Sequence, residues 1–150
     1  MEMDKKFNAS MGFFNAPGIG PNLFNHHNTR IYQYDMQLID AYRANRNDIE
    51  SPTRNFIIFH LCGQHVGYGE RYPADFAKFS ARSVKSKLRL SDEQRGVVAD
   101  YLNATLYNDY VVDSIIRMFA DRNAIVLYFS DHGEEVYDFR LLHGCTDLKT

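Results

Sequence analysis

Two adjacent side chains, Asp131 and His132, are of the types that bind a divalent metal ion. A carboxylate oxygen and an imidazole nitrogen are both among the usual ligands of Zn²⁺. The pair follows the apolar run Ala124 to Phe129 and precedes Gly133, which allows a sharp backbone turn. In an open α/β sheet, reactive groups gather just beyond the carboxyl ends of the strands. This position therefore predicts part of a zinc site.

The same pair has a simpler interpretation. Asp131 could cap a following helix by accepting hydrogen bonds from its first backbone N–H groups. For an Asp-His dipeptide taken alone, capping is the more common role. The choice depends on which other groups reach the same place.

One further candidate is His65, which follows a predicted strand at residues 55–61 and the turn residue Gly63. It would lie at the edge of the sheet where ligands collect. Taken alone, it is more simply explained as a solvated loop histidine. His143, beside Gly144, likewise has a local explanation as a surface histidine at a turn.

The spacing of apolar residues predicts the elements that position these groups. Residues 124–129 and 55–61 are typical of strands buried on both faces. Between them, Ser91 and Gln94 form a capping box that opens a helix running to about Ala120. Strand, helix and strand in this order predict a right-handed crossover in a parallel sheet. The predicted buried face of the helix consists of Val98, Tyr101, Leu102, Thr105, Val112, Ile115, Ile116 and Phe119.

Polar residues in the middle of that helix, Asn108 and Asp109, are predicted to be ordinary solvated or hydrogen-bonded side chains. An earlier helix should present Asp35, Leu38, Ile39 and Tyr42 on one face, with Asp35 near its N-terminus, where the helix dipole favours a negative charge. Residues 1–30 form a poorly defined lead-in, because glycine and proline interrupt them too often for a regular element.

Composition limits the class of protein. The 150 residues, 45% of them hydrophobic with a formal net charge of −2, make one ordinary domain at most. The near-neutral charge gives no electrostatic case for nucleic acid as a partner. No apolar run approaches a membrane span, and the first six residues are too polar to open a signal peptide. Two cysteines do not make a disulfide framework and leave the redox compartment open.

Five segments occur in a fixed order: Asn55 to His65; Arg71-Tyr-Pro73 followed by Phe76 and Phe79; Tyr101 to Ile116; Ser130-Asp-His-Gly-Glu134; and Leu142-His-Gly144. Together they resemble the phosphoethanolamine transferases of the alkaline-phosphatase/sulfatase superfamily. The matched region is residues 31–145. The resemblance implies an α/β fold with a parallel or mixed sheet flanked by helices, alkaline-phosphatase-like but incomplete, so that residues 1–150 are a fragment of a sulfatase-like catalytic domain.

The resemblance also implies site roles. Asp131 and His132 would ligate Zn²⁺, while His65 and His143 would bind the phosphate-bearing head group. In the family, a zinc-activated threonine takes the head group from phosphatidylethanolamine and passes it to an acceptor, here lipid A or a sugar. This occurs at the periplasmic face of the bacterial inner membrane.

The chain departs from the family pattern at its front. The Gly-Glu-Ser and Thr-Thr-Pro-like signatures are missing, so no catalytic residue is identifiable and the threonine nucleophile is expected outside these residues. Two ligands should hold zinc weakly, because a catalytic zinc site normally has three. We therefore expect little or no transferase activity from the 150 residues alone.

Two other functions remain open. A sulfatase or phosphodiesterase of the same superfamily would share the Asp-His-Gly sequence. A non-catalytic interaction module made from a degenerate copy would bind no zinc. The sequence does not specify the acceptor or the oligomeric state.

Overall fold

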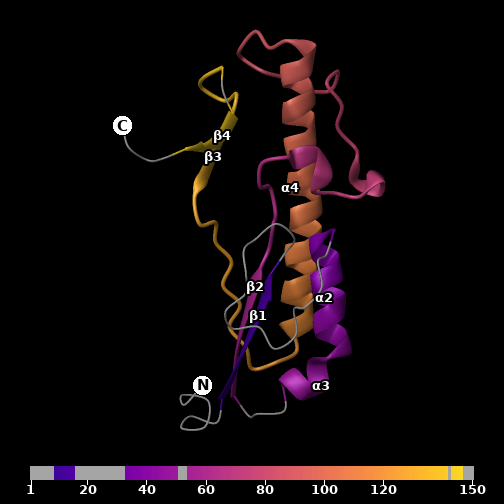
Figure 1. The fold of residues 1–150 in the computed structure, drawn as a ribbon, viewed down its shortest axis with the longest axis vertical. Coiled ribbons are helices and arrows are strands. Elements are labelled where there is room, and N and C mark those ends of the chain that lie inside the picture. The colour runs from indigo at the N-terminus through magenta and orange to yellow at the C-terminus, as the bar shows by residue number, and fades with distance from the viewer. Residues whose placement is uncertain (1–8, 16–32, 51–53, 142, 147–150) are drawn as a thin grey trace. The chain divides into compact units, whose positions relative to one another are not determined.

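A computed structural model describes residues 9–15, 33–50, 54–141 and 143–146 (Figure 1). The chain divides into two compact units, residues 1–62 and 63–150. Most of the predicted lead-in at residues 1–30, and Leu142 of the last motif, lie outside the described residues.

The first unit contains a pair of parallel strands, β1 (Ala9–Asn15) and β2 (Arg54–His60). Their register runs from Ala9 opposite Arg54 to Asn15 opposite His60. Parallel neighbours need a crossover connection, and the helices α2 (Asp35–Ala44) and α3 (Arg46–Ile49) lie within it. Strand β2 confirms the strand predicted at residues 55–61 but not its burial on both faces, because Phe56 is 59% exposed and residues 57–60 are only partly buried. Strand β1 lies in the segment where no element was predicted.

Helix α2 confirms the predicted apolar face. Leu38, Ile39 and Tyr42 are fully buried, and the Tyr42 ring meets Phe59 of β2 edge-on, with the centroids 5.1 Å apart. Asp35 is also buried, and its Oδ1 accepts a hydrogen bond from the Cys62 backbone N–H at 3.0 Å. The packing of this face therefore ties the start of α2 to the end of β2.

The second unit is built on α4 (Asp92–Phe119), with the short 3₁₀ turns η1 (Tyr68–Glu70) and η2 (Ala74–Phe76) against it. The predicted capping box is confirmed. Ser91 Oγ accepts from the Gln94 N–H at 3.2 Å, and Gln94 Oε1 accepts from the Ser91 N–H at 2.8 Å. No helix among the described residues is long and apolar enough to cross a membrane.

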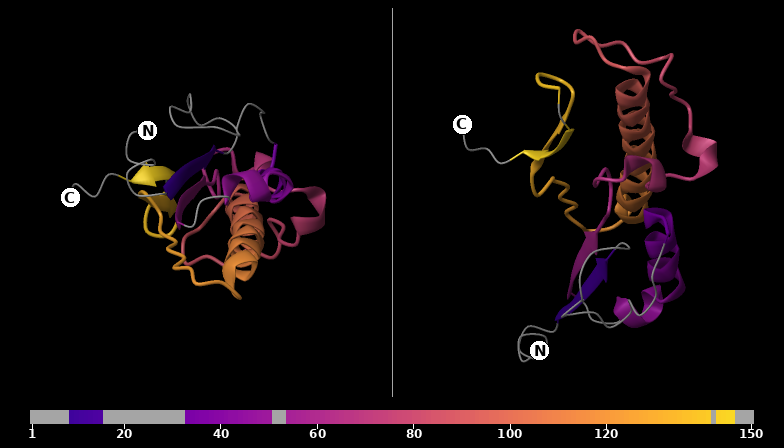
Figure 2. Two further views of the ribbon diagram at one scale, coloured as in Figure 1. Left: turned by 90° about the horizontal axis from the view of Figure 1, so that it is seen from below. Right: turned by 45° about the horizontal axis from the view of Figure 1, so that its top comes forward.

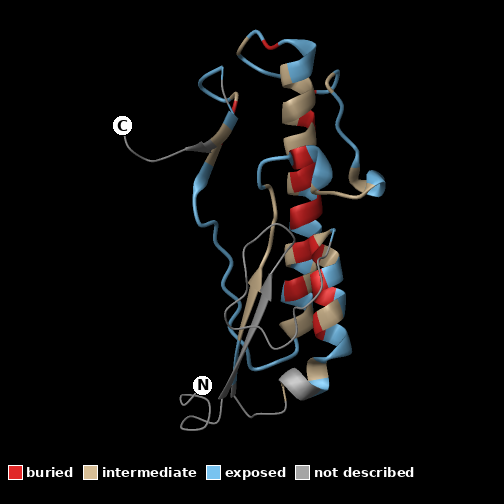
Figure 3. Ribbon diagram, in the orientation of Figure 1, coloured by how far each residue is buried: buried red, intermediate tan, exposed pale blue. Residues whose placement is uncertain are grey.

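The predicted buried face of α4 is wrong. Figure 3 shows buried residues in red along α4. Of the eight residues named, only Ile115 is buried. The buried face is rotated from the predicted one and includes two amides, Asn103 and Asn108, beside apolar side chains. Asn103 Oδ1 accepts from the backbone N–H groups of Lys78 and Phe79, both at 2.8 Å. The buried residues of α4 are Ala99, Asn103, Ala104, Tyr107, Asn108, Val111 and Ile115.

The strand expected at Ala124–Phe129 is not formed. This run is extended but exposed, with Ile125 at 90% and Leu127 at 81% of full exposure. A strand buried on both faces requires neighbouring strands and a layer on each side, and within the described ranges no strand pairs with it. The run leads back alongside α4 towards the C-terminal hairpin (Figures 1 and 2).

That hairpin, β3 (Gly133–Val136) and β4 (His143–Thr146), was not predicted. Its strands are antiparallel, with Gly133 opposite Thr146 and Val136 opposite His143. Val136 packs in a small core with Tyr68 and Ala104, so the hairpin is fixed to η1 and α4 on its apolar side.

Candidate metal site

The structure brings Asp131 and His132 together. His132 Nε2 lies 3.7 Å from Asp131 Oδ1. Two ligands at about 2.0–2.1 Å from a tetrahedral zinc ion are roughly 3.4 Å apart. The spacing of the two atoms is therefore close to that of two ligands on one ion.

The other ring nitrogen of His132 supports the same geometry. Nδ1 lies 3.0 Å from the carbonyl oxygen of Gly133. With the proton on Nδ1 donated to this carbonyl, the lone pair remains on Nε2, the atom that faces Asp131. Ser130 Oγ donates to the His132 carbonyl at 2.5 Å and fixes the local backbone. The donor set therefore fits zinc.

Electrostatics at the pair favour a positive charge. The Gly133 carbonyl and, to a lesser extent, the Asp131 carboxylate raise the pKa of His132. Both side chains are open to solvent, with Asp131 at 81% and His132 at 40% exposure. Because a metal binds only neutral imidazole, protons compete with metal at this site as the pH falls.

The capping interpretation of Asp131 has no helix to act on. The residues after the pair form strand β3. Across the described parts of the chain, no three side chains of His, Cys, Asp or Glu are grouped so as to hold a metal ion. The pair would therefore supply only two ligands to a metal.

His65 lies on an exposed turn that begins at Gly63, whose φ of +52° is in the left-handed region favoured by glycine. Arg71 fastens this turn. Its Nη2 donates to the Val66 carbonyl at 2.8 Å and its Nε to the His65 carbonyl at 3.3 Å. The Arg71-Tyr-Pro motif therefore positions the turn that carries His65.

His143 lies on β4, opposite Val136. Val136 is four positions after His132, which is roughly 13 Å of extended chain at about 3.3 Å per residue. The His143 ring contacts aromatic rings, with centroids 5.4 Å from Tyr137 and 6.2 Å from Tyr68. His143 is thus at the end of the hairpin away from the Asp131–His132 pair.

Several residues near the site were not identified from the sequence. The Tyr68 hydroxyl donates to Glu134 Oε1, which joins η1 to β3. Burial, followed by this hydrogen bond, raises the pKa of Tyr68. Asn108, predicted to be an ordinary solvated or hydrogen-bonded residue, is 5% exposed, and its Nδ2 donates to the Tyr128 hydroxyl at 2.8 Å. A polar residue among apolar ones in a long helix was the available signal.

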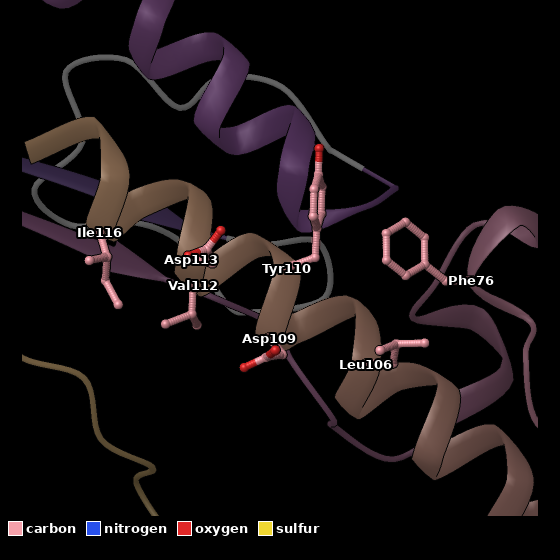
Figure 4. Close-up of a pocket in the computed structure, with 7 residues that line it drawn as sticks. All are labelled: Phe76, Leu106, Asp109, Tyr110, Val112, Asp113 and Ile116. Carbon is pink, nitrogen blue, oxygen red and sulfur yellow. The ribbon is translucent and has the colours of Figure 1, made fainter. Parts of the chain in front are cut away.

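A groove of about 460 Å³ on α4 contains none of these residues (Figure 4). Its acidic groups are Asp109 and Asp113, and Asp113 Oδ2 is paired with Arg117 Nε at 2.6 Å. The groove is lined by Phe76, Leu106, Asp109, Tyr110, Val112, Asp113 and Ile116.

Comparison with known proteins gives consistent matches. The sulfatase family model matches residues 3–149. Phosphoethanolamine transferase EptC of Escherichia coli K12 is 41% identical over 108 residues, which cover 71% of this chain and 18% of that protein. The Kdo(2)-lipid A phosphoethanolamine 7''-transferase of the same strain is 32% identical over 111 residues, or 73% of this chain and 19% of that protein.

Among solved structures, the C-terminal periplasmic domain of E. coli EptC in complex with Zn matches with a TM-score of 0.75 at 30% identity. The match covers 97% of this chain and 46% of that domain. It confirms the predicted alkaline-phosphatase-like α/β fold as part of a domain. The chain thus spans about a fifth of the curated relatives and just under half of the solved domain.

Proposed function

The chain belongs to the sulfatase family, and we propose that it forms part of a zinc-dependent phosphoethanolamine transferase. The observation that carries the proposal is the Asp131–His132 pair, whose facing atoms are 3.7 Å apart. The names of the relatives and the zinc bound to the EptC domain support it. Each reports on another protein, so the transfer of the function to this chain is an inference.

Asp131 Oδ1 and His132 Nε2 would hold the metal. When bound, zinc acts as a Lewis acid that stabilises developing negative charge and lowers the pKa of a coordinated hydroxyl. The Gly133 carbonyl keeps the proton of His132 on Nδ1, so that Nε2 stays available. Ser130 holds the backbone at the same place through the His132 carbonyl.

His65 and His143 would bind the phosphate-bearing head group. Both side chains are exposed, and in the protonated form each donates to a phosphate oxygen. The guanidinium of Arg71 holds the carbonyls of the His65 turn, which fixes the direction from which His65 approaches. The ring contacts with Tyr68 and Tyr137 limit the motion of His143 in the same way.

The donor in this proposal is phosphatidylethanolamine, and the acceptor is lipid A or a sugar. The reaction would take place on the periplasmic side of the bacterial inner membrane. The names of the relatives indicate a lipid A acceptor and a periplasmic domain for those proteins. A hydrolase of the same superfamily, a sulfatase or phosphodiesterase, is the alternative, because it would share the Asp131-His132-Gly133 sequence.

Zinc titration in competition with a chromophoric chelator tests the metal site. The wild-type chain should bind zinc, and Asp131→Ala and His132→Ala should each abolish the binding. Asp121→Ala, which removes an exposed carboxylate just after α4, is the matched control and should bind like wild type. Equal zinc affinity in all four proteins would refute the assignment.

Phosphoethanolamine binding separates the transferase from a sulfatase. Titration of the zinc-loaded chain, followed by ³¹P NMR, should show binding of phosphoethanolamine that weakens in His65→Ala. Zinc affinity should stay the same in that variant. Preference for inorganic sulfate over phosphoethanolamine would favour the sulfatase alternative instead.

A further inference from the structure

Asn108 stands out among the residues near the site because one polar atom of its buried carboxamide is unpaired within the part of the chain that the structure describes. The side chain is 5% exposed, and its Oδ1 has no hydrogen-bond partner among the described residues. An unpaired buried acceptor destabilises the folded state, whereas an apolar side chain of the same size would not. Retention of an amide here requires another explanation.

The Oδ1 atom faces the turn that carries His65. A Cβ added to Gly63 would lie 3.3 Å from Asn108 Oδ1 and 3.7 Å from its Cγ. One helical turn away, Thr105 Oγ1 accepts a hydrogen bond from Gln64 Nε2 at 3.4 Å. The Gly63–Gln64 turn therefore lies directly on the Thr105–Asn108 face of α4.

The nitrogen of the same amide holds a different segment. Asn108 Nδ2 donates to the Tyr128 hydroxyl at 2.8 Å. Tyr128 lies in the exposed run three residues before Asp131, where no described strand pairs with the backbone. This hydrogen bond is therefore an anchor for the chain that leads into Asp131 and His132.

We propose that Asn108 is a positioning residue that sets the His65 turn and the Asp131–His132 segment at a fixed separation. The Oδ1 side of one carboxamide leaves no room for a side chain at Gly63, and its Nδ2 is bonded to Tyr128, so both segments take their place from one point on a rigid helix. The inference rests on the proposed function, because it assumes that His65 and the metal pair act on one phosphate ester.

The first test needs no ligand. Backbone ¹⁵N relaxation of the 150-residue chain should show lower order parameters at residues 63–66 and 128–132 in Asn108→Leu, with α4 unchanged. The unfolding midpoint should stay the same or rise, because the unpaired acceptor is gone. Unchanged order parameters in both segments would overturn the positioning role by themselves.

The second test uses the site. In the zinc-loaded chain, Asn108→Leu should keep zinc affinity within about twofold, because the metal pair is local. Phosphoethanolamine affinity should fall about tenfold, which is within the usual range of coupling between linked segments. If Asn108 had a purely structural role, Asn108→Leu would instead lower the stability of the chain and leave the ratio of phosphoethanolamine affinity to zinc affinity unchanged.

A double-mutant cycle tests whether Asn108 acts through its hydrogen bond to Tyr128. Tyr128→Phe should weaken phosphoethanolamine binding to a similar degree, and the double variant should be no weaker than either single one. Tyr110→Phe, an exposed tyrosine on the same helix, is the control and should bind normally. Additive effects would show that Asn108 does not act through Tyr128.

Failure of the wild-type chain to bind zinc or phosphoethanolamine would instead refute the proposed function. The relaxation measurement would still decide whether Asn108 holds the two segments.

Discussion

Replacement of Asn103 by alanine should destabilise the second unit strongly. The side chain is 1% exposed and makes four hydrogen bonds. Its Oδ1 accepts from the N–H groups of Lys78 and Phe79, and its Nδ2 donates to the Phe79 carbonyl at 3.0 Å and the Tyr72 hydroxyl at 3.2 Å. Three of these partners are backbone groups that lose their side-chain partner together.

The expected cost follows from those contacts. Each neutral hydrogen bond contributes about 1 kcal/mol net, and a buried group left unpaired costs about 1–3 kcal/mol. Allowing for water reaching the segment at residues 78–79, whose side chains are exposed, we expect a loss of roughly 3–5 kcal/mol. A domain stable by about 5–15 kcal/mol would lose a large part of its stability.

Urea unfolding followed by circular dichroism measures this loss. The slope should be equal in wild type and variant, so that the midpoints compare directly. Asn123→Ala, at an exposed position after α4, is the control and should stay within about 0.5 kcal/mol of wild type. A loss below about 1 kcal/mol for Asn103→Ala would refute the idea that this amide fixes the segment at residues 78–79 on α4.

Three further predictions concern other positions. The N–H groups of Phe139, Arg140 and Asp138 lower the pKa of Glu135, so its contribution to stability is present above the unfolded pKa of about 4.3 and is lost as the pH falls through the lower folded value. Glu135→Gln should therefore be less stable than wild type at pH 7. Urea unfolding at pH 3–7 should show this difference in stability disappearing below about pH 4. Gly63→Ala should cost about 1–2 kcal/mol in the same assay, since φ is +52°, and an equally stable variant would contradict the left-handed turn. Leu127→Lys should leave the unfolding free energy within about 0.5 kcal/mol while light scattering shows less aggregation, because the side chain is 81% exposed; a large destabilisation would mean that the run is buried after all.

Local rules predicted part of the fold well. The Ser91–Gln94 capping box placed the start of α4, and the apolar spacing from Asp35 to Tyr42 identified the buried face of α2. Both depend on residues within one or two helical turns of each other. The short distance between the Asp131 and His132 side chains also depends only on local structure, since the two residues are adjacent in sequence.

Features that depend on distant partners were missed. Strands β1 and β4 are defined by pairing with segments elsewhere in the chain, and their sequences carry little of that information. The run 124–129 has the composition of a buried strand, but composition does not supply the neighbours that would bury it. The buried face of α4 includes Asn103 and Asn108, which bind segments distant in sequence. The spacing of apolar residues carries no information on such amides.

Direct observation of the His132 ring tests the central claim most sharply. Long-range ¹H–¹⁵N correlation spectra of the chain resolve the two nitrogens of each imidazole. On addition of zinc, Nε2 of His132 should shift to a metal-bound value while Nδ1 stays protonated by its contact with Gly133. Zinc that leaves the His132 nitrogens unshifted, or that binds through Nδ1, would contradict the account.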